Sequence, residues 1–141
     1  MIKMRPALSR LTVVAAFCTA LFGAAATAAH ADDPIDGAHA DTNTYVAFAG
    51  CNGVVWDGQR RSDGSHFARA TFSLGTSSRG KSCMGWMERS TDNGKSWALV
   101  SGYHFDGDNA TGWYYNGGSY LARACVGDFL YANSYSCGHG R

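Results

Sequence analysis

Residues 66–74, HFARATFSL, decide the fold class because apolar and polar side chains alternate along them. One set consists of Ala68, Ala70, Phe72 and Leu74, and the other of Arg69, Thr71 and Ser73. Successive residues of a β-strand point to opposite faces, so this pattern predicts a strand with one buried and one solvated face.

Similar short runs of aromatic and β-branched residues continue on both sides, separated by Gly, Asn, Asp and Ser, and no helical period is present. The predicted strands cover residues 44–49, 54–57, 66–74, 82–90, 96–105, 112–115, 120–126 and 129–134. Asn93-Gly94 lies between two apolar runs and predicts a hairpin over residues 82–105. The expected fold is all-β, a single small antiparallel β-sandwich or barrel.

The composition agrees with one small globular domain. The chain has 141 residues, of which 45% are hydrophobic and only 16% are charged. A disordered chain would have fewer apolar residues, and a basic nucleic-acid binder would have an excess of positive charge. Both classes are therefore excluded.

The first 31 residues are typical of a secretory signal peptide. Three basic residues lie within the first ten, residues 11–28 are almost wholly apolar or small, and Ala29-His30-Ala31 offers a cleavage site. An uncleaved membrane anchor is the alternative. Cleavage removes the three basic residues and changes the formal net charge from +1 to −2. We expect a secreted, extracellular protein with neither nucleic acid nor a membrane as its partner.

The cysteines predict two disulfides in the mature chain. One of the five lies in the signal peptide, and the others are Cys51, Cys83, Cys125 and Cys137. Three pairings are possible, and we favour Cys51 with Cys83 and Cys125 with Cys137, which would cross-link each half of the chain separately. No Cys-x-x-Cys pair suggests zinc, and the oxygen-rich residues 106–109 lack the glutamate of a calcium loop and are interpreted as a turn. No metal or cofactor is expected.

Residues 32–43 carry four aspartates, no basic residue and little apolar bulk. They predict a flexible acidic N-terminal arm that precedes a disulfide-bonded β domain over residues 44–141. The arm is either an inert linker or a segment that a partner captures. In the second case the candidate partner-binding residues are Asp32, Asp33, Pro34, Ile35 and Asp36, with Ile35 as the apolar anchor.

The aromatic stretch over residues 113–120 is the best candidate for a recognition surface on the β domain. Its candidate contact residues are Trp113, Tyr114, Tyr115 and Tyr120, and Trp56, Tyr131 and Tyr135 are further aromatic residues of the same type. Tyr and Trp provide rigid contact area with a polar tip. Alternate residues of a strand must face the core, so core packing is an equal interpretation.

Residues 90–97, STDNGKSW, resemble the Asp-box of sialidase-type propellers. In that family the Asp accepts backbone hydrogen bonds, the Gly adopts a special dihedral angle and the Trp packs under a hairpin turn. The resemblance implies these structural roles for Asp92, Gly94 and Trp97. The motif occurs once, and the chain is too short for a propeller, so sialidase activity is not implied.

The sequence offers few candidate catalytic residues, and Glu88 is its only glutamate. Combined with His66 or His104 and Arg69 or Arg89, it resembles secreted microbial ribonucleases in residue types, although the flanking sequences do not match. Residues 79–83, RGKSC, would suit a protease inhibitor loop, because a basic residue lies beside a cysteine. Exposed aromatic residues would instead suit a free-standing carbohydrate-binding module. The favoured expectation is a protein that binds and does not catalyse.

The signal peptide, size and composition look like those of small secreted proteins of actinobacteria. Within that group, the two disulfides and the short N-terminal arm resemble the adaptor subunit of umbrella toxin particles. That adaptor joins a lectin subunit to a large toxin scaffold. The resemblance implies that residues 32–43 bind the lectin and that the β domain meets the scaffold.

Overall fold

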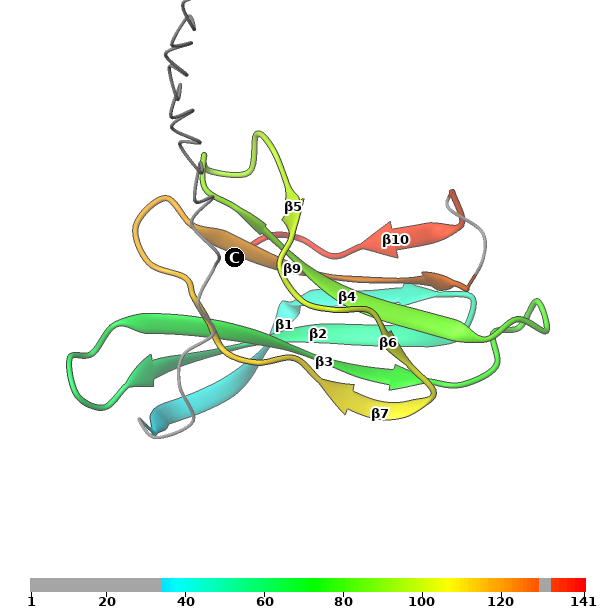
Figure 1. The fold of residues 1–141 in the computed structure, drawn as a ribbon, viewed down its shortest axis with the longest axis horizontal. Coiled ribbons are helices and arrows are strands. Elements are labelled where there is room, and N and C mark those ends of the chain that lie inside the picture. The colour runs from blue at the N-terminus through cyan, green and yellow to red at the C-terminus, as the bar shows by residue number, and fades with distance from the viewer. Residues whose placement is uncertain (1–33, 130–132) are drawn as a thin grey trace, which may run out of the picture.

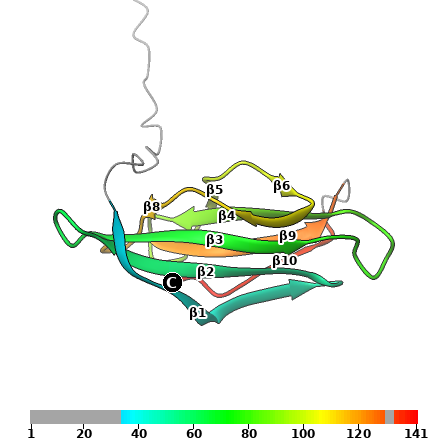
Figure 2. The ribbon, with the colours of Figure 1, turned by 90° about the horizontal axis from the view of Figure 1, so that it is seen from below.

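Two antiparallel sheets of five strands each lie face to face in the computed structural model, which describes residues 34–129 and 133–141 (Figure 1). The first sheet has the order β1-β2-β3-β7, with β8 also paired to β3; the second has the order β10-β9-β4-β5, with β6 also paired to β4. The strands are β1 (Ile35–Phe48), β2 (Cys51–Arg60), β3 (His66–Leu74), β4 (Cys83–Ser90), β5 (Ala98–Leu99), β6 (His104–Phe105), β7 (Gly107–Ala110), β8 (Tyr114–Tyr115), β9 (Leu121–Asp128) and β10 (Tyr135–Cys137). The predicted all-β antiparallel fold is confirmed, in its sandwich form (Figure 2).

The predicted signal peptide, residues 1–31, lies outside the described residues, as do Asp32 and Asp33. The part of the chain that the structure describes contains no helix that could cross a membrane.

The core lies between the two sheets and is centred on Phe72 of β3, which is 3% exposed. A Cβ atom added to Gly85 of β4 would lie 2.7 Å from Phe72 Cδ1, and one added to Gly53 of β2 would lie 2.9 Å from the same atom. The two glycines therefore leave the space that the phenyl ring fills. The neighbouring inward residues of β3, Ala68 and Ala70, are fully buried, as their alternation predicts.

Both predicted disulfides are present. Cys51–Cys83 joins the start of β2 to the start of β4, so it links the two sheets. Cys125–Cys137 joins directly paired residues of β9 and β10 within the second sheet. The favoured pairing is thus confirmed, but the first bridge cross-links the sandwich and is not confined to one layer.

The structure corrects the prediction of a flexible acidic N-terminal arm. Residues 35–43 are not a flexible segment but the first part of β1, which pairs with β2 from Ile35 opposite Arg60 to Phe48 opposite Cys51. Ile35 packs closely on Gly58, where an added Cβ would overlap with the Ile35 side chain. The acidic residues of this segment have basic partners from distant parts of the sequence, so their charge does not keep the segment in solvent.

Two further differences from the predicted strands have a local cause. The expected strand over residues 96–105 is divided into β5 and β6, and the expected turn at residues 106–109 contains β7. Asp106 and Gly107 both have positive φ angles, of 53° and 73°, and this sharp bend takes the chain from the second sheet to the first. The strand expected over residues 129–134 is not present in its described part, since β9 ends at Asp128 and Phe129 lies in a turn.

Candidate functional site

The predicted recognition stretch does not form one surface. Tyr114 is 9% exposed and belongs to the core, because it pairs with the inward-facing Ala68. Tyr115 points to the opposite face, where its ring meets Phe67 and Tyr120 edge to face at 6.0 and 5.4 Å. Trp113 is half-buried. The alternation of β8 therefore divides these side chains between the core and the surface.

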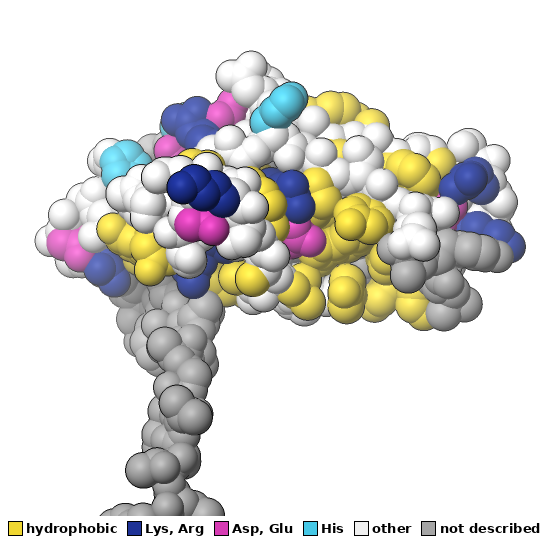
Figure 3. Space-filling view, turned by 90° about the horizontal axis from the view of Figure 1, so that it is seen from above, with side chains coloured by type: hydrophobic (Ala, Val, Ile, Leu, Met, Phe, Trp, Pro, Cys, Tyr) yellow, Lys and Arg dark blue, Asp and Glu magenta, His cyan; other side chains and the backbone are white. Residues whose placement is uncertain are grey.

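Exposed aromatic side chains gather instead on the outer face of the second sheet. Seven large hydrophobic side chains are exposed among the described residues, and five of them belong to this face. We call these five the aromatic face: Leu99, Tyr103, Phe105, Phe129 and Tyr135. Figure 3 views the molecule from this side and shows hydrophobic side chains in a nearly continuous band.

The register of the second sheet explains this grouping. Trp86 of β4 lies opposite Cys125, whose disulfide partner Cys137 is the next residue across the sheet. Met84, two residues from Trp86 and thus on the same face, lies opposite Gly127, which in turn lies opposite Tyr135. The neighbouring strands of this sheet bring their apolar outer residues side by side.

Trp86 holds the centre of the aromatic face. The residue is only 5% exposed, and its ring lies between Tyr103 and Tyr135, at centroid distances of 5.6 and 5.3 Å. The indole Nε1 donates a hydrogen bond of 3.0 Å to Glu88 Oε1, and Arg123 donates to the other carboxylate oxygen at 2.6 and 2.9 Å. A hollow of about 270 Å³ lies between the two tyrosines and Leu99.

A second aromatic pair extends this surface. Phe105 and Phe129 meet edge to face at 5.0 Å, although they are 40% and 41% exposed. Aromatic pairs of this geometry contribute about 0.5–1.5 kcal/mol beyond the area that they bury. The exposed rings are thus held in place before any partner binds.

The predicted nuclease constellation is not brought together. Glu88 contacts Trp86 and Arg123 on the second sheet. His66 lies on the first sheet with its Nδ1 3.8 Å from Asp57, and the His104 ring lies 5.6 Å from Phe72. Neither histidine contacts Glu88, so the structure gives no geometric support to a Glu–His acid–base pair.

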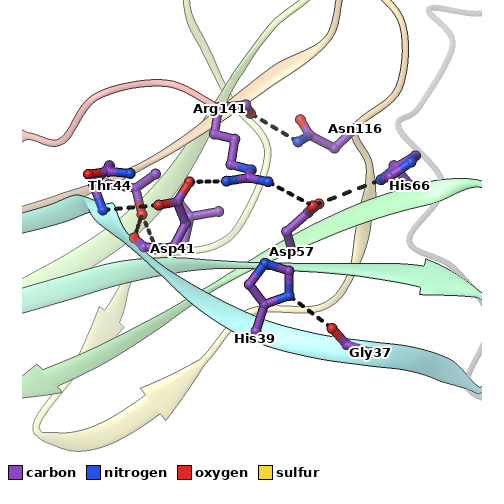
Figure 4. A network of polar contacts seen from close by, with 10 residues as sticks. Gly37, His39, Asp41, Thr44, Asp57, His66, Asn116 and Arg141 are labelled. Carbon is purple, nitrogen blue, oxygen red and sulfur yellow. Dashed lines mark hydrogen bonds and ion pairs between the residues drawn. The ribbon is translucent and has the colours of Figure 1, made fainter.

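A polar network surrounds Arg141 and fastens β1 to the rest of the domain (Figure 4). The guanidinium of Arg141 pairs with Asp41 of β1 and lies 3.5 Å from Asp57 of β2. The backbone of Arg141 exchanges hydrogen bonds with Ala122 of β9. The Arg141 guanidinium and the Asn43 amide lower the pKa of Asp41, and Asp41 in turn raises the pKa of Arg141.

Residues of the predicted arm are also engaged within the domain. Asp36 accepts two hydrogen bonds from Arg61, at 2.7 and 2.8 Å, and this contact lowers its pKa. Pro34 O accepts a bond from Arg61 N. Ile35 is half-buried. None of these three residues extends freely from the domain.

The turn at residues 90–97 has the expected hydrogen bonds. Asp92 accepts bonds from Ser96 N at 2.9 Å and Ser96 Oγ at 2.6 Å, while Gly94 N donates to Ser90 Oγ at 2.7 Å. The Ser96 bonds, together with the Ser90 hydroxyl, which donates to Asp92 Oδ1 at 2.7 Å, lower the pKa of Asp92 to about 2. Gly94 has a φ of 83°, and the ring of Trp97 lies near it. Asp92, Gly94 and Trp97 are thus parts of a structural turn.

The arginine of the predicted inhibitor loop is exposed, with 56% of the Arg79 side chain accessible to solvent, but it is engaged within the domain. Arg79 donates a 3.0 Å hydrogen bond to the buried Asp128, and its guanidinium lies 5.6 Å from the Phe48 ring centroid. Insertion into a protease pocket would first require this contact to break.

Comparisons with protein-family models, with curated proteins and with solved structures gave no match for this chain.

Sequence reasoning missed most of the aromatic face. Tyr135 was among the candidates, but Trp86, Tyr103, Phe105 and Phe129 were not, and Tyr131 lies outside the described residues. A signal was present in the predicted hairpin. Both faces of residues 83–88 carry apolar side chains, so one of the two faces had to lie outside a two-layer core.

Proposed function

We propose that this chain is a secreted, non-catalytic protein-binding module and that the aromatic face is its docking surface. The observation that carries the proposal is the concentration of five large exposed apolar side chains on one outer sheet face. Contiguous exposed apolar surface on a small domain is typical of protein-interaction sites.

The chemistry of this face favours a protein partner. Tyr, Trp and Phe are the residues enriched at the centres of protein interfaces. Tyr103 and Tyr135 expose 54% and 46% of their surface, yet both pack against Trp86 and lose little conformational freedom on binding. The Glu88–Arg123 ion pair borders the apolar residues and supplies a polar rim.

The resemblance to the adaptor subunit of umbrella toxin particles indicates which partners to test first. They are a secreted lectin subunit and a large toxin scaffold. In this proposal the β domain meets one such partner through the aromatic face. Pro34, Ile35 and Asp36 are engaged in the domain, so the proposal does not depend on a free arm.

The test compares two matched variants. Tyr103→Ser/Tyr135→Ser alters the aromatic face, and Tyr45→Ser removes an exposed tyrosine from the opposite sheet. Each protein is immobilised and exposed to the secreted proteins of its native culture. A retained protein is then purified, and its affinity is measured for all three forms.

We expect the aromatic-face variant to bind at least about tenfold more weakly than the wild type, as for the loss of central interface tyrosines. The Tyr45→Ser control should bind like the wild type. Equal binding by all three forms, or failure of the wild type to retain any secreted protein, would refute the proposal.

A further inference from the structure

The outer face of the first sheet carries a shallow groove of about 560 Å³. We call it the first-sheet groove, and its principal side chains are Tyr45, Asn52, Val54, Trp56, Thr71 and Asp108. The groove lies on the first sheet and the aromatic face on the second, so the full thickness of the sandwich separates them. Figures 2 and 3 view the molecule from these two opposite sides. Its volume falls within the range of about 300–1,000 Å³ that small-molecule sites occupy.

The two aromatic rings of the groove are oriented by bonds to neighbouring side chains. Tyr45 Oη donates a 2.6 Å hydrogen bond to Asn52 Oδ1, and Trp56 Nε1 donates a 2.8 Å bond to Thr71 Oγ1. Tyr45 is 56% exposed. A ligand would therefore meet ring surfaces that are already in place, together with an apolar floor that includes Val54.

Polar side chains accompany these rings. Asn52 pairs with Ser73 across the sheet, and Ser73 pairs with Asp108 of β7, so an amide, a hydroxyl and a carboxylate lie in one row on the groove. Aromatic rings beside amide and carboxylate groups suit sugars, whose C–H faces stack on rings and whose hydroxyls both donate and accept.

A basic side chain lies beside this groove. Arg69 pairs with Trp56 across β2 and β3, and its guanidinium lies 5.6 Å from the Trp56 ring and 4.9 Å from the Trp113 ring. Its Nε is buried and has no hydrogen-bond partner among the described residues. Among the residues that the structure describes, the guanidinium contacts only these two rings, which leaves its terminal N–H groups for an anionic ligand.

We propose that the first-sheet groove binds a saccharide that carries a carboxylate, such as a uronic-acid oligomer. Its sugar rings lie against Tyr45 and Trp56, and its carboxylate accepts hydrogen bonds from Arg69. This site is independent of the proposed protein-docking surface, because it lies on the other sheet.

The experiment measures binding of sodium trigalacturonate by titration calorimetry, with the neutral trisaccharide maltotriose as the matched probe. The full domain is used as wild type, Tyr45→Ala, Arg69→Gln and, as a control on the aromatic face, Tyr103→Ser. Circular dichroism and thermal unfolding show whether each variant is folded. Tyr45 is largely exposed, so we expect Tyr45→Ala to fold. This variant therefore still tests the proposal if Arg69→Gln does not fold.

We expect trigalacturonate to bind more tightly than maltotriose, and more weakly at high salt, because the carboxylate contact is charged. Tyr45→Ala and Arg69→Gln should each raise its Kd by about tenfold, the usual effect of losing a charge-assisted hydrogen bond or a stacked ring. Tyr103→Ser should bind the sugar like the wild type.

The proposal is overturned if trigalacturonate does not bind, or if Tyr45→Ala and Arg69→Gln leave its affinity unchanged. Loss of sugar binding only in Tyr103→Ser would also overturn it, because the sugar would then occupy the aromatic face. A failure of protein capture, by contrast, concerns the proposed function alone.

Discussion

At the scale of single residues, the close contact between Gly85 and Phe72 determines how tightly the sheets pack. A Cβ on residue 85 would lie 2.7 and 2.8 Å from two ring atoms of Phe72, closer than folded proteins allow. The ring is buried and also packs near Gly53, so it has little space to move. We predict that Gly85→Ala lowers the free energy of unfolding by about 1–3 kcal/mol.

Urea denaturation measures this effect, and Gly75→Ala is the matched control. An added Cβ at Gly75 would have no atom within 4 Å, and this residue has no positive φ. We expect the control to unfold within about 0.5 kcal/mol of the wild type. Equal destabilisation by both variants would show that the contact with Phe72 is not the cause.

Asp92 gives a pH dependence at the same scale. Its hydrogen bonds with Ser96 and Ser90 lower the folded-state pKa from 3.8 to about 2. A lowered pKa stabilises the fold above the unfolded value, and that stabilisation is lost as the pH falls from about 3.8 to about 2. We predict that Asp92→Asn lowers the Tm at pH 6 and that the difference from the wild type shrinks towards pH 2. A difference that stays constant with pH would contradict this linkage.

At the scale of the strands, the sequence predicted β3 with its correct bounds, because the side-chain alternation over residues 66–74 is a local property. The start of β1 was missed for the opposite reason. Asp36 and Asp41 have partners 25 and 100 residues away, in Arg61 and Arg141, and no local pattern reveals such pairs. A charge-rich segment was therefore interpreted as solvated, although distant arginines hold it in the sheet.

In this arrangement, Arg141 links β1 to β9. Its backbone is bonded to β9, and its side chain holds Asp41 of β1, which is 8% exposed. Arg141→Gln would leave this largely buried carboxylate without its cation, at a cost of about 1 kcal/mol. We predict that amide hydrogen exchange in residues 35–43 becomes about fivefold faster.

The exchange rates of β3 serve as the internal reference, and Lys95→Gln is the control variant. Lys95 is an exposed residue of the 90–97 turn, far in sequence from β1. Exchange in β3 should not change in either variant. Uniformly faster exchange across both sheets would show that Arg141 stabilises the whole domain and not β1 in particular.

At the scale of the whole molecule, the two outer faces of the sandwich explain why the candidate site was harder to predict than the fold. Turn residues and alternation indicate where strands lie, but they do not say which strands become neighbours. Tyr114 was a candidate contact residue and is buried, whereas Tyr103 was not and is exposed. Each outcome depends on the register of one strand against another, which determines the face to which a side chain points.

The two disulfides act differently on this two-layer architecture. Cys51–Cys83 closes a sequence separation of 32 residues and links the two sheets, whereas Cys125–Cys137 closes 12 residues between strands that are already paired. In the chain-entropy treatment, these separations correspond to stabilisation by about 4 and about 3 kcal/mol. We predict that Cys51→Ala/Cys83→Ala lowers the free energy of unfolding by about 1 kcal/mol more than Cys125→Ala/Cys137→Ala. Urea denaturation of the two double variants measures the difference. An equal or larger loss from the second pair would show that the bridge within the sheet, whose Cys125 lies opposite Trp86, contributes at least as much to the fold as the bridge between the sheets.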